Sequence, residues 1–203
     1  PRMTGWTHHR GLAVGLPRES IDTDQLIPAR FMSVPRVQGY GPYLLHDMRR
    51  TEGGTLRADF PLNRHPTASV LVTRRNFGSG SSREAAVYAL VDAGIRAVIA
   101  PTFGDIFSGN AVNNGLLPLT LPSAAVDALL TTLGTDTTEV AIDLAQGHLR
   151  LGPHLYEFAL PEVWREKLLN GWDDIDLTVS RAEAIATFRA GRKMAAPWVW
   201  PNH

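Results

Sequence analysis

The chain of 203 residues contains no cysteine. This absence excludes disulfide bonds, and it leaves no thiolate to ligate zinc or an iron–sulfur cluster. The seven histidines show neither the His-x-x-x-His nor the His-Glu-x-x-His spacing. A histidine-based metal site is therefore not predicted, and we expect this chain to bind no metal and no cofactor of its own.

The chain also lacks an excess of charge and a long apolar run. Twenty Lys and Arg residues balance twenty Asp and Glu residues, which argues against a nucleic acid or an acidic membrane bound by bulk electrostatics. No run approaches the roughly 18 apolar residues of a membrane-spanning helix, and the N-terminus lacks the apolar core of a signal peptide. We expect a soluble, cytoplasmic protein with no nucleic-acid or membrane partner.

Strands and helices alternate in the first part of the chain. Eighteen glycines and fourteen prolines favour many short elements joined by turns. Periodicity predicts, in order, strands at 11–16 and 69–73, a helix capped by Ser81 and stopped by Gly94, a strand at 97–100, a helix at 106–112 and a strand at 116–121. This order predicts an α/β fold with a right-handed parallel core, whose ligands bind beyond the carboxyl ends of the strands.

The remainder predicts further short elements within one domain. These are a helix at 123–132 capped by Ser123, strands at 140–144, 149–151 and 155–160, a helix at 161–170 with Pro161 first and Gly171 past its end, and a last helix at 181–190. The apolar stretch 197–201 is expected to dock on a neighbouring surface. We predict one domain over residues 1–203, with a core of about 10–190 and a C-terminal tail of 191–203.

The segment from residue 76 to 94 carries the strongest functional pattern. Gly78 and Gly80 flank small hydroxyl residues, which lets the backbone approach a ligand closely. Free backbone N–H groups at a helix start, the hydroxyls and the guanidinium of Arg83 would favour an anion here. On these features alone, an anion-binding loop and a plain strand-to-helix turn stand as equal alternatives.

The start of this helix is predicted from the spacing of Ser81 and Glu84, which is that of a capping box. Ser180 and Glu183 have the same spacing, and nothing around them suggests chemistry. The pattern by itself therefore indicates a helix start and no more.

Two carboxylates, Asp22 and Asp24, lie two residues apart before Pro28. On an extended chain they would share one face and could position a catalytic group or bind a metal. The alternative is an Asx-turn or an N-cap before a short helix at 25–27, and the spacing alone favours that alternative.

Residues 29–63 form a long, irregular connection, and connections of this length are usually functional or disordered. Tyr40 and Tyr43 accompany five arginines in it: Arg30, Arg36, Arg49, Arg50 and Arg57. Such a composition suits recognition of a carboxylate substrate or of a partner surface, and a solvated loop is an equal alternative.

Several common site motifs are absent. Residues 78–83 keep two of the three glycines of the dinucleotide-binding fingerprint, because Arg83 stands where the third would be. Neither a P-loop nor a Gly-x-Ser-x-Gly nucleophile elbow is present.

Taken together, several segments resemble the small subunit of 3-isopropylmalate dehydratase, which corresponds to the swivelling C-terminal domain of the aconitase superfamily. The resemblance covers roughly residues 10 to 190 in order. The matching segments are 22–31, 59–60, 62–63, 76–84, 97–107 and 113–118. It implies the aconitase-type swivelling β/β/α fold, with a central, largely parallel sheet flanked by helices.

The resemblance also implies roles for individual residues. Ser81 stands at the position of the family's catalytic base, and Ser82 and Arg83 stand at positions that bind the substrate. Asp24 corresponds to an active-site aspartate, and Arg36 stands at the spacing of a further substrate-binding arginine. A serine hydroxyl is a poor base, so its alkoxide needs preorganised donors, which the loop amides and Arg83 could supply.

The implied partner is a large subunit that carries a [4Fe–4S] cluster held by three cysteines, and the implied substrate is a small hydroxy-diacid. The open iron would act as the Lewis acid that the hydroxyl leaving group needs. The implied activity is a hydro-lyase that converts 2-isopropylmalate to 3-isopropylmalate by dehydration and rehydration in leucine biosynthesis, and only with the large subunit.

Two positions depart from the family pattern. Ser79 replaces a cysteine found in many members, and Ala85 replaces the usual histidine after Arg-Glu. The second change keeps two alternatives open: the same chemistry on a related acid, such as methylmalate/citraconate or homoaconitate, or a non-catalytic subunit kept for assembly.

Overall fold

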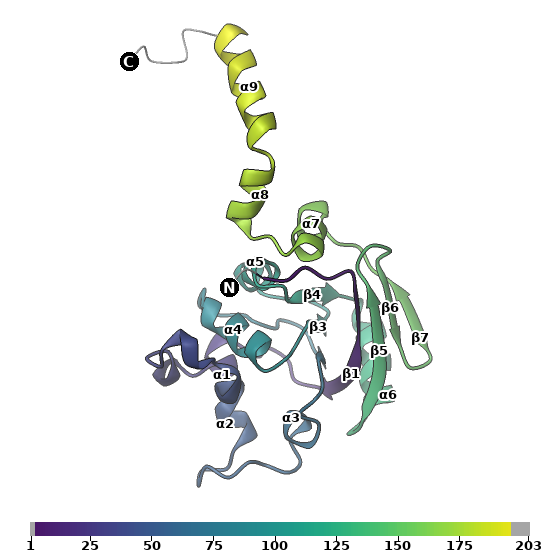
Figure 1. Ribbon diagram of the computed structural model, residues 1–203. Helices are drawn as coiled ribbons and strands as arrows, with labels where there is room; N and C mark the ends of the chain where they lie inside the picture. Colours follow the sequence, from purple (N-terminus) through teal and green to yellow (C-terminus); the bar gives the residue numbers. More distant parts are fainter. Residues whose placement is uncertain (1–2, 196–203) are drawn as a thin grey trace.

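A single sheet organises residues 3–195, which are the residues that the computed structural model describes (Figure 1). The seven-stranded sheet has the order β4-β3-β2-β1-β5-β6-β7. The strands are β1 (His8–Leu16), β2 (Val70–Thr73), β3 (Ala97–Ala100), β4 (Leu117–Thr120), β5 (Thr137–Asp143), β6 (His148–Leu151) and β7 (His154–Glu157). The structure confirms the predicted α/β class and every predicted strand; β3 has the predicted ends, and the other strands begin or end at different residues.

The sheet has a parallel half and an antiparallel half that meet at β1. Strands β1 to β4 run parallel, and β2, β3 and β4 are connected through α4 (Glu84–Asp92) and α5 (Asp105–Asn113). Strand β1 pairs antiparallel with β5, which continues through β6 to β7. The predicted parallel core is thus confirmed, and the loops after β2 and β3 leave from the same edge of the sheet.

Apolar side chains on alternate faces of the strands build a core on each side of the sheet. On one side, Leu71 and Val98 pack against α4 and α1 (Thr23–Leu26). On the other, Val72 and Ile99 pack against α6 (Ser123–Leu133) and the curled antiparallel half. Burial on both faces explains why the parallel strands are short, continuous apolar runs.

The long connection between β1 and β2 is made of short helices. After α1 they are η1 (Ala29–Phe31), η2 (Arg36–Gln38), η3 (Gly41–Tyr43), α2 (His46–Arg49) and α3 (Pro61–Arg64). Asp22 is the N-cap of α1, and its carboxylate and the side chain of Gln25 complete a capping box. The helix-cap interpretation of Asp22 is therefore confirmed.

Two predicted helix caps are wrong. Helix α4 begins at Glu84 with Arg83 as N-cap, and no side chain caps it. The Glu84 carboxylate accepts a hydrogen bond (2.9 Å) from Nδ2 of Asn114, the C-cap of α5, so it is drawn away from the position that a capping box needs. Helix α6 has Pro122 as N-cap, which makes Ser123 its first helical residue.

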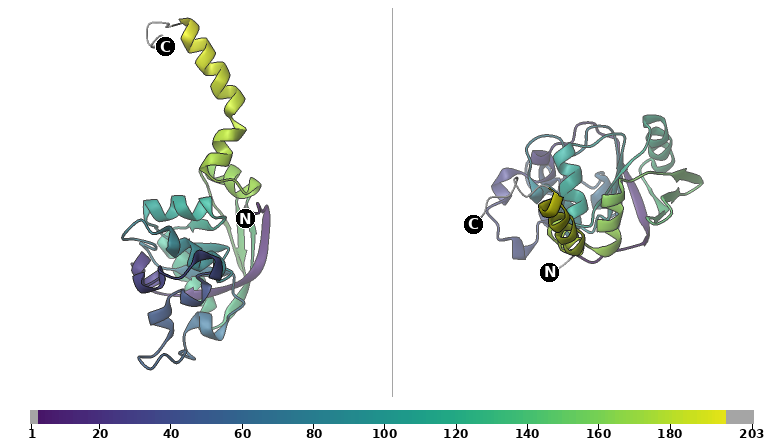
Figure 2. Two further views of the ribbon diagram at one scale, coloured as in Figure 1. Left: turned by 60° about the vertical axis from the view of Figure 1, so that its left-hand side comes forward. Right: turned by 90° about the horizontal axis from the view of Figure 1, so that it is seen from above.

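The C-terminal region forms an arm that projects from the body (Figures 1 and 2). Helix α7 (Glu162–Asn170) has Pro161 as N-cap and the left-handed Gly171 as C-cap, one residue from the prediction at its start. The sequence analysis missed α8 (Asp174–Ser180), and α9 (Ala182–Ala195) outlasts the predicted 181–190. We call α8 and α9 the C-terminal arm. The stretch 197–201 lies outside the described residues.

None of the helices within residues 3–195 combines the length and apolar character needed to cross a membrane.

Candidate functional site

The loop between β2 and α4 is tied to two neighbouring segments. Ile21 O accepts from Gly78 N at 2.7 Å, and Ser79 O accepts from Thr23 N at 2.9 Å. Phe77 N donates to Thr102 O, on the connection between β3 and α5. These backbone bonds hold the loop between α1 and α5 at the carboxyl edge of the parallel strands, where the topology predicted a ligand site.

Gly78 and Gly80 adopt conformations that side chains rarely take, with φ of +72° and +100°. A Cβ at Gly78 would lie 2.2 Å from the ring of Phe107. Glycine at position 78 is therefore required both by the backbone angle and by the close approach of α5. The sequence analysis expected these two glycines to permit a close approach of the loop backbone, and the backbone at Gly78 does lie close to Phe107.

A cavity of about 250 Å³ opens between this loop and the start of α5. Its lining residues are Thr23, residues 78–83, residues 104–107 and Asn110. Three of the five predicted site residues, Ser81, Ser82 and Arg83, are among them. The pocket is bordered by two helix starts, α4 and α5, and neither has a side-chain cap. Their first backbone N–H groups lack intrahelical acceptors, which favours an anion.

Arg83 and Asp24 meet at the rim of this cavity, although 59 residues separate them in sequence. Arg83 Nη1 donates to Asp24 Oδ1. The Arg83 side chain is 24% exposed and that of Asp24 is 61% exposed. Because only one guanidinium nitrogen is engaged by Asp24, other Arg83 donors remain for a ligand carboxylate. Asp24 thus contacts a cavity residue without lining the cavity itself.

The backbone around Ser81 is fixed, while its hydroxyl is not. Ser81 O accepts from Thr23 Oγ1 at 3.0 Å and from Arg83 N at 2.8 Å. No residue in the range 3–195 hydrogen-bonds to the hydroxyl of Ser81 or Ser82. The capping bond expected for Ser81 is absent, so both hydroxyls are exposed to a ligand in the cavity.

The structure does not bring Arg36 to this site. Its guanidinium forms a two-pronged pair with Asp92, at 2.7 and 3.0 Å, and lies 4.2 Å above the ring of Tyr88. Asp92 ends α4, whereas Arg83 precedes its start, so the helix length of about 13 Å separates them. In this conformation Arg36 holds the 29–63 connection against α4.

Four cavity residues on α5 were not predicted: Asp105, Ile106, Phe107 and Asn110. Ile106 is 57% exposed, which is unusual for an isoleucine in the first turn of a helix beside a polar loop. The sequence could not predict this exposure, because an apolar residue at the start of a helix normally indicates packing in the core. Asp105 adds a negative charge at the start of α5, where it complements the helix dipole.

Ser79 and Ala85, the two departures from the family pattern, differ in their position relative to the cavity. Ser79 lines the cavity. Ala85 is only 8% exposed and packs in the core cluster beside α1, and it does not line the cavity.

Two larger hollows occur elsewhere on the described surface. One of about 570 Å³ lies on the open face of β1, β5 and β6, and another of about 660 Å³ lies beside α2 and includes Arg30, Arg50 and Arg57. Neither contains one of the five residues assigned to the site from the resemblance, and the second gathers three of the five arginines of the 29–63 connection. Within residues 3–195, no group of three or more histidine, cysteine, aspartate or glutamate side chains could hold a metal ion.

Comparison with known proteins gives the family. Residues 3–124 match the aconitase C-terminal domain. The chain is 40% identical over 210 residues to a 3-isopropylmalate dehydratase small subunit of Teredinibacter turnerae, covering 98% of both chains. It is 44% identical over 195 residues to the protein of that name in Shewanella amazonensis, covering 93% of this chain and 96% of the relative.

A solved structure from Methanocaldococcus jannaschii, titled 3-isopropylmalate dehydratase, aligns with a TM-score of 0.64 at 27% identity. The alignment covers 90% of this chain and 99% of that one. The fold is thus that of an aconitase C-terminal domain. Within that class, the chain belongs to the family of 3-isopropylmalate dehydratase small subunits.

Proposed function

We propose that this chain is the small subunit of a hydro-lyase that isomerises 2-isopropylmalate to 3-isopropylmalate in leucine biosynthesis. The observation that carries the proposal is the cavity that joins Ser81, Ser82 and Arg83 between two uncapped helix starts. The names of the relatives support this substrate and do not favour the related acids or the non-catalytic subunit.

In this proposal Ser81 is the catalytic base. Its oxygen takes the proton from the carbon next to a substrate carboxylate, the electron pair forms the carbon–carbon double bond, and the hydroxyl leaves from the neighbouring carbon. Water then adds back with hydrogen and hydroxyl exchanged between the two carbons. The free N–H groups at the start of α4 and the guanidinium of Arg83 stabilise the negative charge on the Ser81 oxygen.

Arg83 and Ser82 hold the substrate. Arg83 receives a carboxylate on the donors that Asp24 leaves free, while Asp24 fixes the orientation of the guanidinium. Ile106 supplies an exposed apolar surface at the cavity, which suits the isopropyl group. Arg36 would contact the substrate only after release from Asp92.

The second half of the site belongs to the large subunit. We propose that this partner holds the [4Fe–4S] cluster, which, when bound, polarises the departing hydroxyl as a Lewis acid. The donor set of this chain is consistent with this division, since it has no cysteine for such a cluster.

The test is turnover by this chain mixed anaerobically with the cluster-loaded large subunit from the same cell. Absorbance of the unsaturated diacid is followed with isopropylmalate and with methylmalate. We expect turnover that needs both chains, a preference for isopropylmalate, and a loss of about 10³-fold in kcat for Ser81→Ala. Normal turnover by Ser81→Ala would refute the role of the base, and preference for methylmalate would replace the proposed substrate.

A further inference from the structure

The C-terminal arm exposes apolar side chains in two pairs. Ile175 and Val179 are four residues apart on α8, and Ile185 and Phe188 are three apart on α9, so each pair shares a helix face. Ile175, Val179 and Phe188 are 72%, 68% and 64% exposed. Every residue from Thr178 to Arg192 is exposed. The body of the chain, as described, does not cover these side chains.

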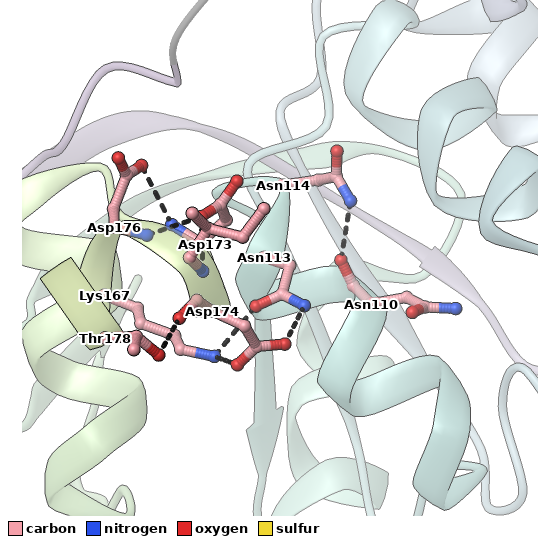
Figure 3. Close-up of polar contacts among 9 residues, drawn as sticks. Asn110, Asn113, Asn114, Lys167, Asp173, Asp174, Asp176 and Thr178 are labelled. Atoms are coloured by element: carbon pink, nitrogen blue, oxygen red, sulfur yellow. Dashed lines mark hydrogen bonds and ion pairs between the residues drawn. The ribbon is translucent and has the colours of Figure 1, made fainter. Parts of the chain in front are cut away.

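The base of the arm is fixed to the body by polar contacts (Figure 3). Lys167 Nζ donates to Asp174 Oδ1 and, at 2.9 Å, to Asn113 Oδ1, while Asn113 Nδ2 donates to Asp174 Oδ2 at 2.9 Å. Arg181 adds an ion pair with Glu166 of α7 at 2.7 Å. These contacts set the direction in which the arm leaves the body.

The exposed arm calls for a partner on physical grounds. Isolated helices of fewer than about 12–15 residues are marginal in water, and most helical stability in proteins comes from packing an amphipathic face. Helix α9 has 14 residues and packs little of its surface on the body. A stable arm therefore needs another surface against Ile185 and Phe188.

We propose that the C-terminal arm docks on the large subunit, which covers the arm and the cavity together. This inference rests on the proposed function, which requires a large subunit at the cavity. Half the surface of the arm amounts to roughly 500 Å², from about 1.5 Å of rise per residue and a helix width of about 10 Å. A stable interface needs roughly 800 Å² per partner, so two arms pairing alone would be too small an interface.

Helix α5 connects the two surfaces. Its start lines the cavity through Asp105 and Ile106, and its last residue, Asn113, contacts Asp174 at the base of the arm. Nine helical residues span about 13 Å, so a single partner that covers the cavity reaches the base of the arm without a gap.

The arm also defines the chemistry of the docking surface. Arg189 and Arg192 accompany Phe188 on α9, and the Arg192 guanidinium lies 5.9 Å from the centroid of the Phe188 ring. The matching surface is an apolar groove for Ile185 and Phe188 with carboxylates along its rim.

The test uses the full chain and the immobilised, cluster-loaded large subunit. The double variant Ile185→Asp/Phe188→Asp is expected to weaken binding about tenfold or more, because two apolar contacts become charges. The control is Leu155→Asp on β7, which replaces an apolar residue about as exposed as Phe188 (62% against 64%) and is expected to leave binding unchanged. Thermal unfolding checks that both variants keep the fold, and kcat at saturating large subunit should match the wild type.

Each outcome decides between defined alternatives. Unchanged affinity of the double variant, with normal wild-type binding and turnover, overturns the docking proposal alone. A wild-type chain that does not bind the large subunit overturns both proposals. Sedimentation showing a homodimer that the double variant dissociates, without loss of affinity for the large subunit, assigns the arm to a second copy and also overturns the proposal.

Discussion

Two ion pairs in this molecule look alike and differ in what surrounds the cation. Arg83 pairs with Asp24 at the cavity, and Lys167 pairs with Asp174 at the base of the arm. Both carboxylates are exposed and lie in the first turn of a short helix that has a complete capping box. The Lys167 side chain, however, is only 7% exposed, against 24% for Arg83.

The difference separates a structural cation from a functional one. Lys167 directs its ammonium group to two acceptors, Asp174 and Asn113, and is shielded from solvent. Arg83 gives one nitrogen to Asp24 and turns toward a cavity. We therefore expect substitutions at Lys167 and Asp174 to change stability and substitutions at Arg83 to change activity.

The largest effect is expected at Arg83. Arg83→Ala should lower kcat/KM of the reconstituted pair about 10³-fold, or about 4 kcal/mol of transition-state stabilisation, because the carboxylate clamp is lost. The midpoint of thermal unfolding should change little, since exposed ion pairs contribute little to stability. Arg83→Lys keeps the positive charge but not the bidentate guanidinium geometry, so it should lower kcat/KM less than Arg83→Ala does. If Arg83→Ala lowered the free energy of unfolding as much as the free energy of transition-state stabilisation, Arg83 would be a structural cation like Lys167, contrary to the comparison.

An intermediate effect is expected at the base of the arm. Asp174→Ala leaves the buried ammonium of Lys167 with Asn113 as its remaining acceptor, which should lower the free energy of unfolding by about 2 kcal/mol. Because the Asp174 carboxylate is exposed, this loss in the free energy of unfolding should be smaller than the cost of breaking a fully buried ion pair. Urea unfolding measures it, and the double variant Lys167→Met/Asp174→Ala should recover most of the loss. A loss in the double variant as large as that of Asp174→Ala would argue against the buried charge as the cause.

The smallest effect is expected from pH. Hydrogen bonds from Lys167 and then Asn113 lower the pKa of the Asp174 carboxyl. A carboxyl whose pKa is lower in the folded state stabilises the fold above its unfolded pKa of about 3.9, and this contribution is lost as pH falls through the folded value. Solvent screening should keep it below about 1 kcal/mol. Urea unfolding of wild type and Asp174→Asn at pH 7 and below pH 4 should show the difference narrowing in acid.

The fold followed from the sequence wherever the signal was local. The parallel strands at 69–73 and 97–100 were predicted from short apolar runs, and the loop at 78–80 from its glycines. Helix α8 was missed because its start depends on Asp173, whose carboxylate accepts from Ile175 N and Asp176 N, in a capping box closed by a second aspartate. The usual signature has Glu or Gln at that third position.

The start of α4 shows why local signals fail at a site. Ser81 and Glu84 fit a capping box in sequence, but the helix begins at Glu84, so Ser81 lies two residues before the N-cap, Arg83. Asn114, from a distant segment, binds the Glu84 carboxylate, and no side chain caps the helix. The position of Ser81 in the cavity was predictable from the resemblance, and the freedom of its hydroxyl was not.

The sequence by itself determined the strands, the glycine loop and the family, because these depend on periodicity, backbone freedom and the order of motifs along the chain. Only the tertiary structure decided that Asp24 engages Arg83, that Arg36 engages Asp92 and that Ile106 faces the cavity. It also decided that α9 stands apart from the body. These arrangements depend on contacts between residues far apart in the chain, and such contacts form only when the packed elements bring them within a few ångströms of each other.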